Sequence, residues 1–372
     1  ILAQQHYNTI VQFLKDMSIK AALLTGSTKM AARKTIHQGL ENGELQILTG
    51  THALIENKVQ FRNLGFVVID EQHRFGVAQR AKLWKKNAVP PHVLVMTATP
   101  IPRTLAMTVY GDLDISIIDE LPPGRKSIKT LHYYDSKRAI VFHFIREQIK
   151  QGRQIYVVYP LIEESETMDL KDLMDGFESL SRDFPLPDYQ IGVVHGRLKQ
   201  EDKDYEMQRF KEGKTHILVA TTVIEVGVDI PNATVMVIES AERFGLSQLH
   251  QLRGRVGRGG DQSYCILMSG YKLSKEARLR LGTMVKTNNG FEISEVDLKL
   301  RGPGDITGTQ QSGILDLKIA SIVKDEPLVA LARKIAIEIL NDDPHLAKPE
   351  NLLLNRQLRK LSQQSGNWGL IS

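Results

Sequence analysis

The sequence predicts an α/β protein with two parallel-sheet lobes in tandem and a C-terminal extension of helices and loops. Three observations lead to this fold class. Short apolar runs alternate with helical segments through most of the chain, which is typical of parallel sheets covered by helices on both faces. The segment Leu121-Pro-Pro-Gly-Arg125 interrupts this alternation and reads as a linker. A chain of 372 residues is also too long for one ordinary core.

The first lobe, predicted for residues 1–121, contains strands that each end in polar or small residues. A helix with helical spacing of its apolar side chains is expected ahead of them, from Leu2 to Asp16. Ligands of parallel sheets bind at the carboxyl ends of the strands, so the residues that follow each strand are the candidates for a site. The predicted strands are 21–24, 45–48, 66–69 and 93–96.

Two acidic residues, Asp70 and Glu71, directly follow the most apolar of these strands. One carboxylate at such a point can hold Mg²⁺ through coordinated waters, and a second can position an attacking water. For an isolated Asp-Glu pair, a polar strand end that caps the next helix is the simpler interpretation. The longer pattern Asp70-Glu-Gln-His73, with Thr97-Ala-Thr99 after the next strand, favours the catalytic interpretation.

Other loops at the same edge of the first lobe carry small, hydroxyl or basic residues. Side chains and backbone amides of this kind suit contacts with phosphate groups. Each loop by itself is more often an ordinary turn. The candidate residues in these loops are Gly26, Thr51, His52 and Arg74.

The second lobe, predicted for residues 122–285, repeats the alternation of strands and helices. Its predicted strands are 128–133, 155–159, 191–194, 217–220, 235–238 and 264–268. Two strand ends carry candidate ligands. Gly196 and Arg197 follow one strand and suit nucleic-acid phosphate, and Thr221-Thr-Val-Ile-Glu-Val-Gly-Val-Asp229 follows the next. There, Gly227 lets the backbone approach a ligand, and the Asp229 carboxylate can accept a hydrogen bond from a ribose hydroxyl.

A glycine-rich loop with three arginines follows the strand 235–238. Residues 247–252 are predicted to be helical, and glycines at 254, 257, 259 and 260 then break the pattern. We expect Arg253, Arg255 and Arg258 on this loop, where guanidinium groups would suit a polyphosphate. A solvated basic turn is the alternative interpretation for scattered arginines.

Composition limits the possible functions. The balance of 48 Lys and Arg against 43 Asp and Glu gives a net charge of +5, which permits a polyanionic partner without requiring one. A single cysteine, Cys265, excludes a disulfide framework or a cysteine-rich zinc site within this sequence. We find no apolar run of membrane length and no signal peptide, so we expect a cytoplasmic protein. Because the first residue is Ile, we expect the sequence to be part of a longer protein.

These motifs together resemble those of superfamily 2 helicases. Asp70-Glu-Gln-His73 resembles their Walker B motif, Thr97-Ala-Thr99 their coupling motif, and Gln251-x-x-Gly-Arg255-x-x-Arg258 their last motif. The resemblance implies two RecA-like lobes that use ATP and Mg²⁺. It also implies that Asp70 binds Mg²⁺, that Glu71 orients the attacking water, and that His73 couples to Thr97 and Thr99. Arg255 and Arg258 would then contact the phosphates, and Gln251, Gly227 and Asp229 would bind the nucleotide. Nucleic acid would be contacted by Thr221, Thr222 and the loop residues named above.

The tail, predicted for residues 286–372, departs from the pattern of two lobes. An amphipathic run is expected to end in a rigid turn, Arg301-Gly-Pro-Gly304, and helices are expected at 315–340 and 351–361. The stretch from Phe291 resembles a translocation motif shared by the RecG family and the bacterial transcription-repair coupling factors. The resemblance implies that Arg301, Gln310 and Gln311 matter for movement on duplex DNA.

The segments 70–77, 96–103 and 158–165 resemble the RecG family of branch-migration helicases, and the resemblance covers nearly the whole chain in order. It implies a motor that uses ATP and Mg²⁺ to remodel branched DNA such as stalled replication forks and Holliday junctions. We expect a monomer that binds branched or duplex DNA. A transcription-repair coupling translocase and a non-catalytic nucleic-acid-binding module are the alternatives. The sequence contains no Gly-x-x-x-x-Gly-Lys-Ser/Thr phosphate loop, so we expect this chain alone not to hydrolyse ATP.

Overall fold

The computed structural model describes residues 2–71, 86, 89–97, 116–118, 120–160, 166–221, 230–305 and 325–364. The chain forms two compact units that are each continuous in space but not in sequence. The first unit contains residues 1–23, 47–51 and 119–297, and the second contains residues 24–46, 52–118 and 298–372. The predicted domain boundaries near residues 121 and 285 stay predictions.

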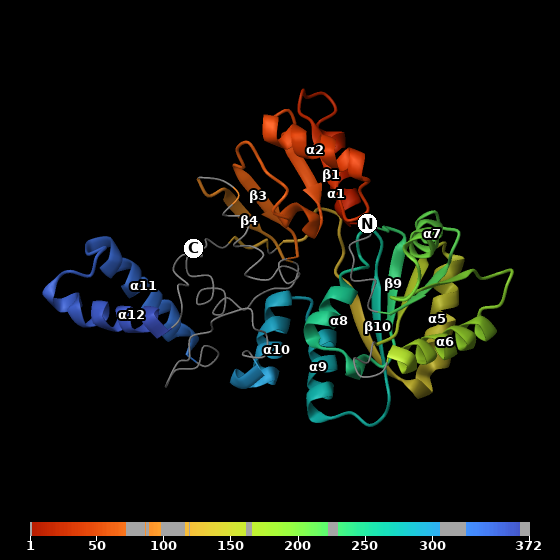
Figure 1. Cartoon of the computed structure of the whole chain (residues 1–372). Helices are drawn as coiled ribbons and strands as arrows, with labels where there is room; N and C mark the ends of the chain where they lie inside the picture. The colour runs from red at the N-terminus through yellow and green to blue at the C-terminus, as the bar shows by residue number, and fades with distance from the viewer. Residues whose placement is uncertain are drawn as a thin grey trace. The chain divides into compact units, whose positions relative to one another are not determined.

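A parallel six-stranded sheet forms the centre of the first unit (Figure 1). Its strands lie in the order β5-β10-β9-β6-β8-β7, and every neighbouring pair is parallel. All six predicted strands of the second lobe are confirmed within one or two residues. They are β5 (Lys129–Tyr134), β6 (Gln154–Val158), β7 (Ile191–Val194), β8 (Ile217–Ala220), β9 (Ala233–Ile238) and β10 (Tyr264–Ser269).

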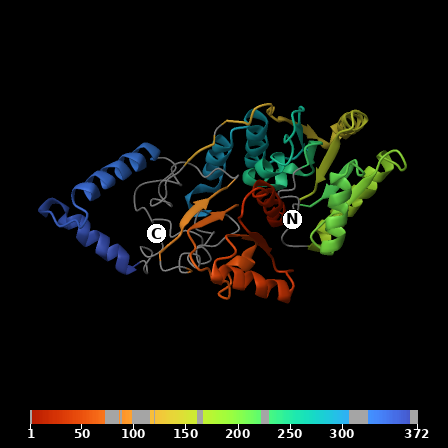
Figure 2. The same ribbon diagram turned by 90° about the horizontal axis from the view of Figure 1, so that it is seen from above.

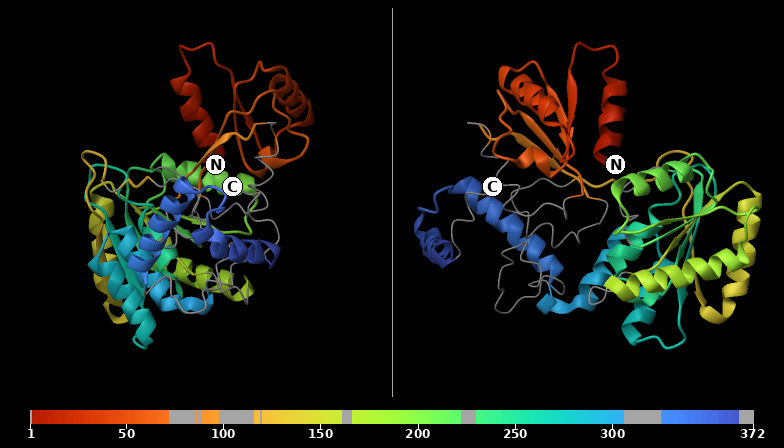
Figure 3. Two further views of the ribbon diagram at one scale, coloured as in Figure 1. Left: turned by 90° about the vertical axis from the view of Figure 1, so that its left-hand side faces the viewer. Right: turned by 45° about the vertical axis from the view of Figure 1, so that its right-hand side comes forward.

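Helices cover both faces of this sheet. On one face, α5 (Arg138–Lys150) and α6 (Glu166–Asp183) pack against the odd-numbered residues of β6, such as Ile155 and Val157. These two helices lie on the side of the sheet opposite α8 (Leu246–Arg253) and α9 (Lys275–Lys286) (Figure 1; Figure 3, right). On the other face of β6, Tyr156 contacts Phe210 of α7 (Gln200–Lys211), with ring centroids 4.9 Å apart.

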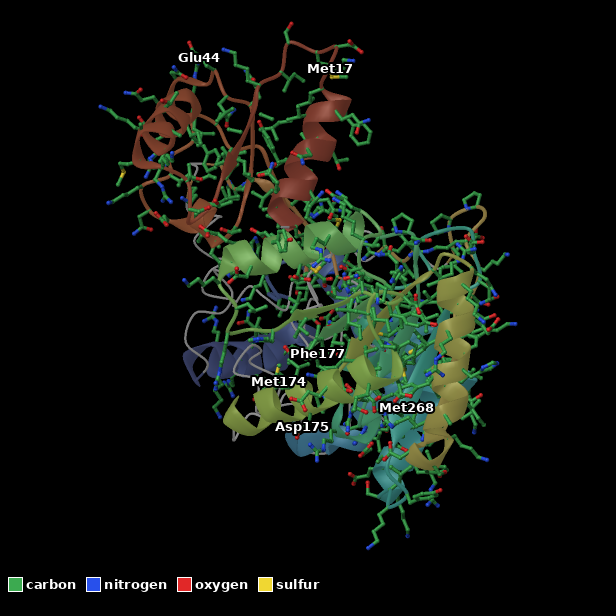
Figure 4. The ribbon with its side chains drawn as sticks, turned by 90° about the vertical axis from the view of Figure 1, so that its right-hand side faces the viewer. Met17, Glu44, Met174, Asp175, Phe177 and Met268 are labelled. Atoms are coloured by element: carbon green, nitrogen blue, oxygen red, sulfur yellow. The ribbon has the colours of Figure 1, made fainter. Side chains whose placement is uncertain are left out.

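Burial explains why these short apolar runs form strands. Every residue of β6, β8 and β9 is buried, which suits aliphatic and β-branched side chains covered on both faces. Full burial of one such side chain contributes about 1.5–3 kcal/mol. The helices show the same selection of faces: Phe177 of α6 packs against the core that contains Met268, whereas Met174 and Asp175 are exposed (Figure 4).

The N-terminal residues form α1 (Leu2–Phe13), β1 (Ala21–Leu24) and β2 (Ile47–Gly50), with β1 paired to β2 and α1 packed against β2. The predicted strand 45–48 begins two residues late. The amide of Leu45 instead donates to the carbonyl oxygen of Gly39 at the end of the preceding helix (2.9 Å), which takes Leu45 out of the ladder.

The second unit contains another parallel pair, β3 (Phe66–Ile69) and β4 (His92–Val95), as predicted. Ile69 and Ile55 form its small core with Val67, Val93 and Val95. In the described part of the first lobe, therefore, the predicted strands form two separate pairs. The other elements here are α2 (Met30–Asn42), η1 (His52–Ile55), α11 (Glu326–Asp342), η6 (Pro349–Asn351) and α12 (Leu352–Gln364).

The helices α11 and α12 are joined by a compact turn (Figure 2). The carboxylate of Asp343 accepts hydrogen bonds from the amides of Ala347 (2.9 Å) and Lys348 (2.8 Å) and from Asn351 Nδ2 (3.0 Å). These bonds, that of Asn351 first, lower the pKa of Asp343 to about 2. The predicted tail helix 351–361 is confirmed as α12 to within a few residues. The helix predicted at 315–340 is confirmed from Glu326 onward, and Asp325 lies outside it.

The predicted turn at Arg301-Gly-Pro-Gly304 is wrong. Helix α10 (Gly290–Asp305) continues through these residues. Proline has a helical φ and is unfavourable inside a helix because it removes one hydrogen bond and its ring meets the carbonyl four residues back. Since α10 ends two residues after Pro303, only the last turn is affected.

Candidate functional site

The parallel pairing of β3 and β4 places the two acidic residues beside the predicted coupling threonine. Ile69 is paired with Val95, and the amide of Met96 donates to the Ile69 carbonyl oxygen at 2.8 Å. Asp70, Glu71 and Thr97 therefore leave the two strands at the same carboxyl edge. The described parts of the two motifs therefore lie at neighbouring strand ends, while their roles stay predictions.

The backbone at Glu71 has an unusual conformation. Its φ is +53°, in the left-handed region that costs a non-glycine residue about 1–2 kcal/mol. The Glu71 amide donates to Asp70 Oδ1 at 2.9 Å, which fixes the turn. Strained residues of this kind cluster at active sites, so the conformation of Glu71 supports a functional role for this turn.

The donor set at this edge fits Mg²⁺ better than a metal that requires a complete protein cage. Among the described residues, no three His, Cys, Asp or Glu side chains converge as metal ligands. Mg²⁺ usually keeps several waters and binds through one or two carboxylates together with substrate phosphates. Asp70, with Glu71 beside it, is sufficient for that arrangement.

A hydroxyl-rich turn follows β1 in the predicted phosphate-contact loop. Thr28 Oγ1 accepts from the Thr25 amide (2.9 Å), and the hydroxyls of Thr25 and Ser27 are 3.0 Å apart. Arg33 of α2 donates to the Thr25 carbonyl oxygen (2.9 Å) and holds the turn. A Cβ added to Gly26 would meet no atom within 4 Å, so the backbone of this turn is accessible to a ligand. Thr51 and His52, at the end of β2, are also exposed.

The predicted contacts after β7 and β8 come together because these strands are neighbours. Val194 pairs with Ala220, which brings Gly196 and Arg197 to the same edge as Thr221. Lys203 of α7 donates to the Gly196 carbonyl oxygen at 2.8 Å and adds a second cation. The strand order thus brings these candidate residues to one edge of the sheet.

Two buried polar atoms at this edge lack a hydrogen-bond partner among the described residues. They are the hydroxyl of Thr221, a residue that is 2% exposed, and Nδ1 of His195. Burial, with Lys203 and Arg197 nearby, lowers the pKa of His195, so its imidazole is neutral at pH 7. Polar groups without partners beside two cations suit an anionic ligand such as a phosphate.

The arginine loop begins where α8 ends, and the backbone at Gly257 requires glycine. Gly257 has a φ of +78°, and a Cβ added there would lie 2.9 Å from Ile128 Cγ1. Arg125 of the linker donates to the Gly257 carbonyl oxygen at 2.6 Å. Arg255 is buried and Arg258 is half-buried, and Gln251 lies one turn earlier on α8.

The prediction that Arg253 belongs to this loop is wrong. Arg253 is the last residue of α8 and only 2% exposed. Its guanidinium donates to the carbonyl oxygens of Met284 (3.0 Å) and Thr287 (2.9 Å) at the end of α9. Burial, and then the nearby Arg253, lower the pKa of His250 to about 4. Arg253 therefore joins α8 to α9, because the end of the helix turns its side chain inward.

Sequence reasoning missed an ion pair at the carboxyl edge of the six-stranded sheet. The Glu239 carboxylate, at the end of β9, accepts two hydrogen bonds from Arg138, which begins α5. A residue that is 101 positions away cannot be identified as a partner from local patterns. An acidic residue that directly follows a fully apolar strand was the only available signal.

Three known domain families match the chain in order. The DEAD/DEAH box helicase family matches residues 1–108, and the helicase conserved C-terminal domain matches residues 136–260. Residues 287–372 match domain 3, C-terminal, of ATP-dependent DNA helicase RecG.

Curated relatives extend this similarity over almost the whole chain. ATP-dependent DNA helicase RecG of Synechocystis is 54% identical over 93% of this chain and 41% of the relative. The protein of the same name from Escherichia coli K12 is 46% identical over 94% of this chain and 50% of its own length. The chain belongs to the RecG family.

This chain spans about half the length of the RecG relatives that it matches. A solved structure described as RecG bound to three-way DNA junction is similar over 88% of this chain and 42% of that chain, with 45% identity and a TM-score of 0.67. Saccharomyces cerevisiae Dbp5 is 15% identical with a TM-score of 0.55, which supports the fold alone. The predicted fold class of two RecA-like lobes with a C-terminal helical RecG domain is confirmed.

Several predicted site residues lie outside the part of the chain that the structure describes. Of Arg301 the structure describes the backbone, within α10. The predicted residues that the structure does not describe are His73, Arg74, Thr99, Thr222, Gly227, Asp229, Gln310 and Gln311.

Among the described helices, none combines the length and hydrophobicity needed to cross a bilayer.

Proposed function

We propose that the full-length protein containing this chain is an ATP-dependent DNA helicase that remodels branched DNA. The observation that carries this proposal is the 45% identity, over 88% of the chain, to a RecG protein whose structure holds a three-way DNA junction. The chain's share of the activity would be the motor, because both helicase families match within residues 1–260.

In this proposal, Asp70 holds Mg²⁺ through coordinated waters, and Glu71 orients the water that attacks the γ-phosphorus of ATP. The bond from that phosphorus to the bridging oxygen breaks, and ADP and inorganic phosphate leave. Mg²⁺ supplies positive charge to the phosphate oxygens. Arg255 and Arg258 stabilise the charge that develops on the phosphates, and Gln251, Gly227, Asp229, His73, Thr97 and Thr99 serve nucleotide binding and coupling.

The proposed DNA contacts are supported by the grouping of residues at strand ends. Arg197 and Thr221 lie at neighbouring strand ends beside polar atoms that lack partners among the described residues. Ser247 of α8 donates to Asp297 of α10 at 3.2 Å, so the helix that leads into the arginine loop contacts the helix that leads into the tail. The further proposed contacts are Gly26, Thr51, His52, Arg74, Gly196, Thr222, Arg301, Gln310 and Gln311.

The domain limits 1–121, 122–285 and 286–372, a monomeric state and a cytoplasmic location also belong to this proposal. The limits are supported by the family matches: the proposed boundary at 121 falls between the matches 1–108 and 136–260, and the RecG domain match begins at residue 287. The match of residues 287–372 to the RecG domain favours this function over a transcription-repair coupling translocase.

ATP hydrolysis by the full-length protein, measured with forked DNA and with linear duplex, tests the proposal. We expect stimulation by forked DNA. The variant Glu71→Gln should bind ATP and lose hydrolysis by about 10³-fold or more, since it removes the group that orients the water. Val68→Ala, in the strand β3 that leads into Glu71 and 50% exposed, is the control and should keep the wild-type rate. Normal turnover by Glu71→Gln would refute its assigned role, and a non-catalytic DNA-binding protein would show no stimulated turnover.

A further inference from the structure

The carboxylate of Glu239 is almost completely buried, and one guanidinium group binds both of its oxygens. Arg138 Nη1 lies 2.6 Å from Oε1, and Nη2 lies 2.8 Å from Oε2. The side chain of Glu239 is only 7% exposed, whereas that of Arg138 is 35% exposed. A two-pronged pair of this kind fixes the orientation of both side chains as well as their charge.

Arg138 is itself held in place from its own side. Its Nη2 also donates to Asp135 Oδ1 at 2.9 Å, and its guanidinium lies 5.9 Å from the centre of the Phe142 ring. Tyr159, at the end of the neighbouring strand β6, is also close to the pair. Burial and the Glu239 charge raise the pKa of Tyr159, so its hydroxyl stays neutral and adds no negative charge beside the carboxylate.

Glu239 is the first residue of the segment that ends in the arginine loop. Directly after it, Ser240 has a φ of +47° and turns the chain into η5 (Ala241–Arg243). A non-glycine residue keeps such a conformation only when the surrounding structure fixes it. Glu239 is fixed on the sheet side by its own amide, which donates to the Val158 carbonyl oxygen at 2.9 Å.

Further along, hydrogen bonds to its backbone carbonyl groups and from the side chain of Arg253 connect this segment to other elements. These hydrogen bonds fix the backbone between Glu239 and Arg258, but each of them joins a guanidinium group to a neutral carbonyl group. They run from Arg280 to the Glu242 carbonyl oxygen (2.8 Å), from Arg253 to the Met284 (3.0 Å) and Thr287 (2.9 Å) carbonyl oxygens, and from Arg125 to the Gly257 carbonyl oxygen (2.6 Å).

We propose that Arg138 and Glu239 form a positioning pair that sets where Arg255 and Arg258 lie during ATP hydrolysis. This inference rests on the proposed function and adds two residues that touch neither nucleotide nor DNA. It assigns to α5 a part in catalysis through the bend at Ser240. A displacement of about 1 Å at a catalytic group can lower a rate by about 100-fold, so loss of the pair should be visible in turnover.

The test measures DNA-stimulated ATP hydrolysis by the full-length protein carrying Glu239→Gln, a change that keeps the size of the side chain. We expect kcat and kcat/KM to fall together by about 10- to 100-fold with KM nearly unchanged, because the arginines act in the transition state. Arg138→Lys keeps the charge but loses the two-pronged geometry, and should show a smaller fall. This variant also serves if Glu239→Gln does not fold.

The matched control is Arg146→Gln on the same helix. Arg146 has a similar exposure of 33%, pairs with Asp183 and lies 4.9 Å from the centre of the Phe184 ring, but it contacts nothing in the segment 239–258 among its described interactions. It should keep the wild-type kcat. A loss of kcat in Arg146→Gln equal to that in Glu239→Gln would overturn the inference, since any broken pair on α5 would then have the same effect.

The decisive measurement combines Glu239→Gln with Arg258→Ala. If the pair acts through Arg258, adding Glu239→Gln to the Arg258→Ala variant should lower kcat by less than about twofold. Full additivity of the two effects would overturn the inference while leaving the proposed function intact. If Arg258→Ala turned over at the wild-type rate, or the wild type showed no stimulated turnover, the proposed function would fail and this inference with it.

Discussion

Two parallel-sheet regions of this chain are both built from strands rich in apolar residues but differ in burial. All five residues of β6, Gln154 to Val158, are buried. In β3, of the sequence Phe-Val-Val-Ile, only Ile69 is buried, and Phe66 and Val68 are 59% and 50% exposed. An apolar run therefore predicts a strand, but the neighbouring strands and the covering helices decide how much stability it contributes.

The two regions also differ in how they combine a stabilising core with candidate site residues. The six-stranded sheet has a large core of buried aliphatic and aromatic side chains, and its ligand candidates are confined to the ends of strands. The β3–β4 pair has a small core but carries the acidic turn at Glu71, with its unusual φ of +53°. Substitutions in the two regions should therefore affect different measured quantities.

The largest expected effect on folding tests the comparison directly. Ile217→Ala, in the fully buried strand β8 of the six-stranded sheet and 0% exposed, should lower the free energy of unfolding by about 2–5 kcal/mol. Val68→Ala removes a side chain that is 50% exposed and should change it by less than about 1 kcal/mol. Denaturant unfolding of both variants measures this. Equal losses would show that the burial difference has no energetic meaning.

A smaller effect is expected at the arginine loop. Gly257→Ala should destabilise the protein by about 1–3 kcal/mol, because alanine meets both the left-handed φ and the nearby Ile128 side chain. Gly213→Ala is the control: Gly213 has a φ of +73°, but its added Cβ would meet nothing within 4 Å. Thermal unfolding compares the two. If both variants lose the same stability, contact with Ile128 contributes nothing and only the backbone conformation matters.

The smallest expected effect depends on pH and concerns His250 in α8. Its pKa is about 4 in the folded protein, lowered by burial, against about 6.5 in the unfolded chain. Between pH 6.5 and pH 4 the unfolded chain binds a proton that the folded protein does not, so stability should fall as pH falls. After a discount for partial exposure, we expect a loss on the order of 1 kcal/mol. His250→Gln should flatten this part of the pH profile, and an unchanged profile would contradict the assignment.

Local patterns in the sequence were sufficient for the elements and for much of the candidate site. Alternating apolar runs located every strand of the described sheets within two residues, since burial between helices selects the same residue types in each strand. The positions of Asp70, Thr97, Arg197 and Thr221 also followed from sequence, because residues after parallel strands must meet at one edge. The helix through Gly302 and Pro303 did not, since composition indicates a turn there.

Only the tertiary structure decided which partners the charged groups bind. The amino-acid sequence determined the RecA-like fold class and the RecG-type tail, and it indicated which strand ends are candidates for the site; all of these depend on short-range order along the chain. It did not determine that Arg253 faces inward to α9 or that Arg138 binds Glu239. Those contacts join residues far apart in sequence, and only the order of the strands and the packing of α5 and α9 bring them within hydrogen-bond distance.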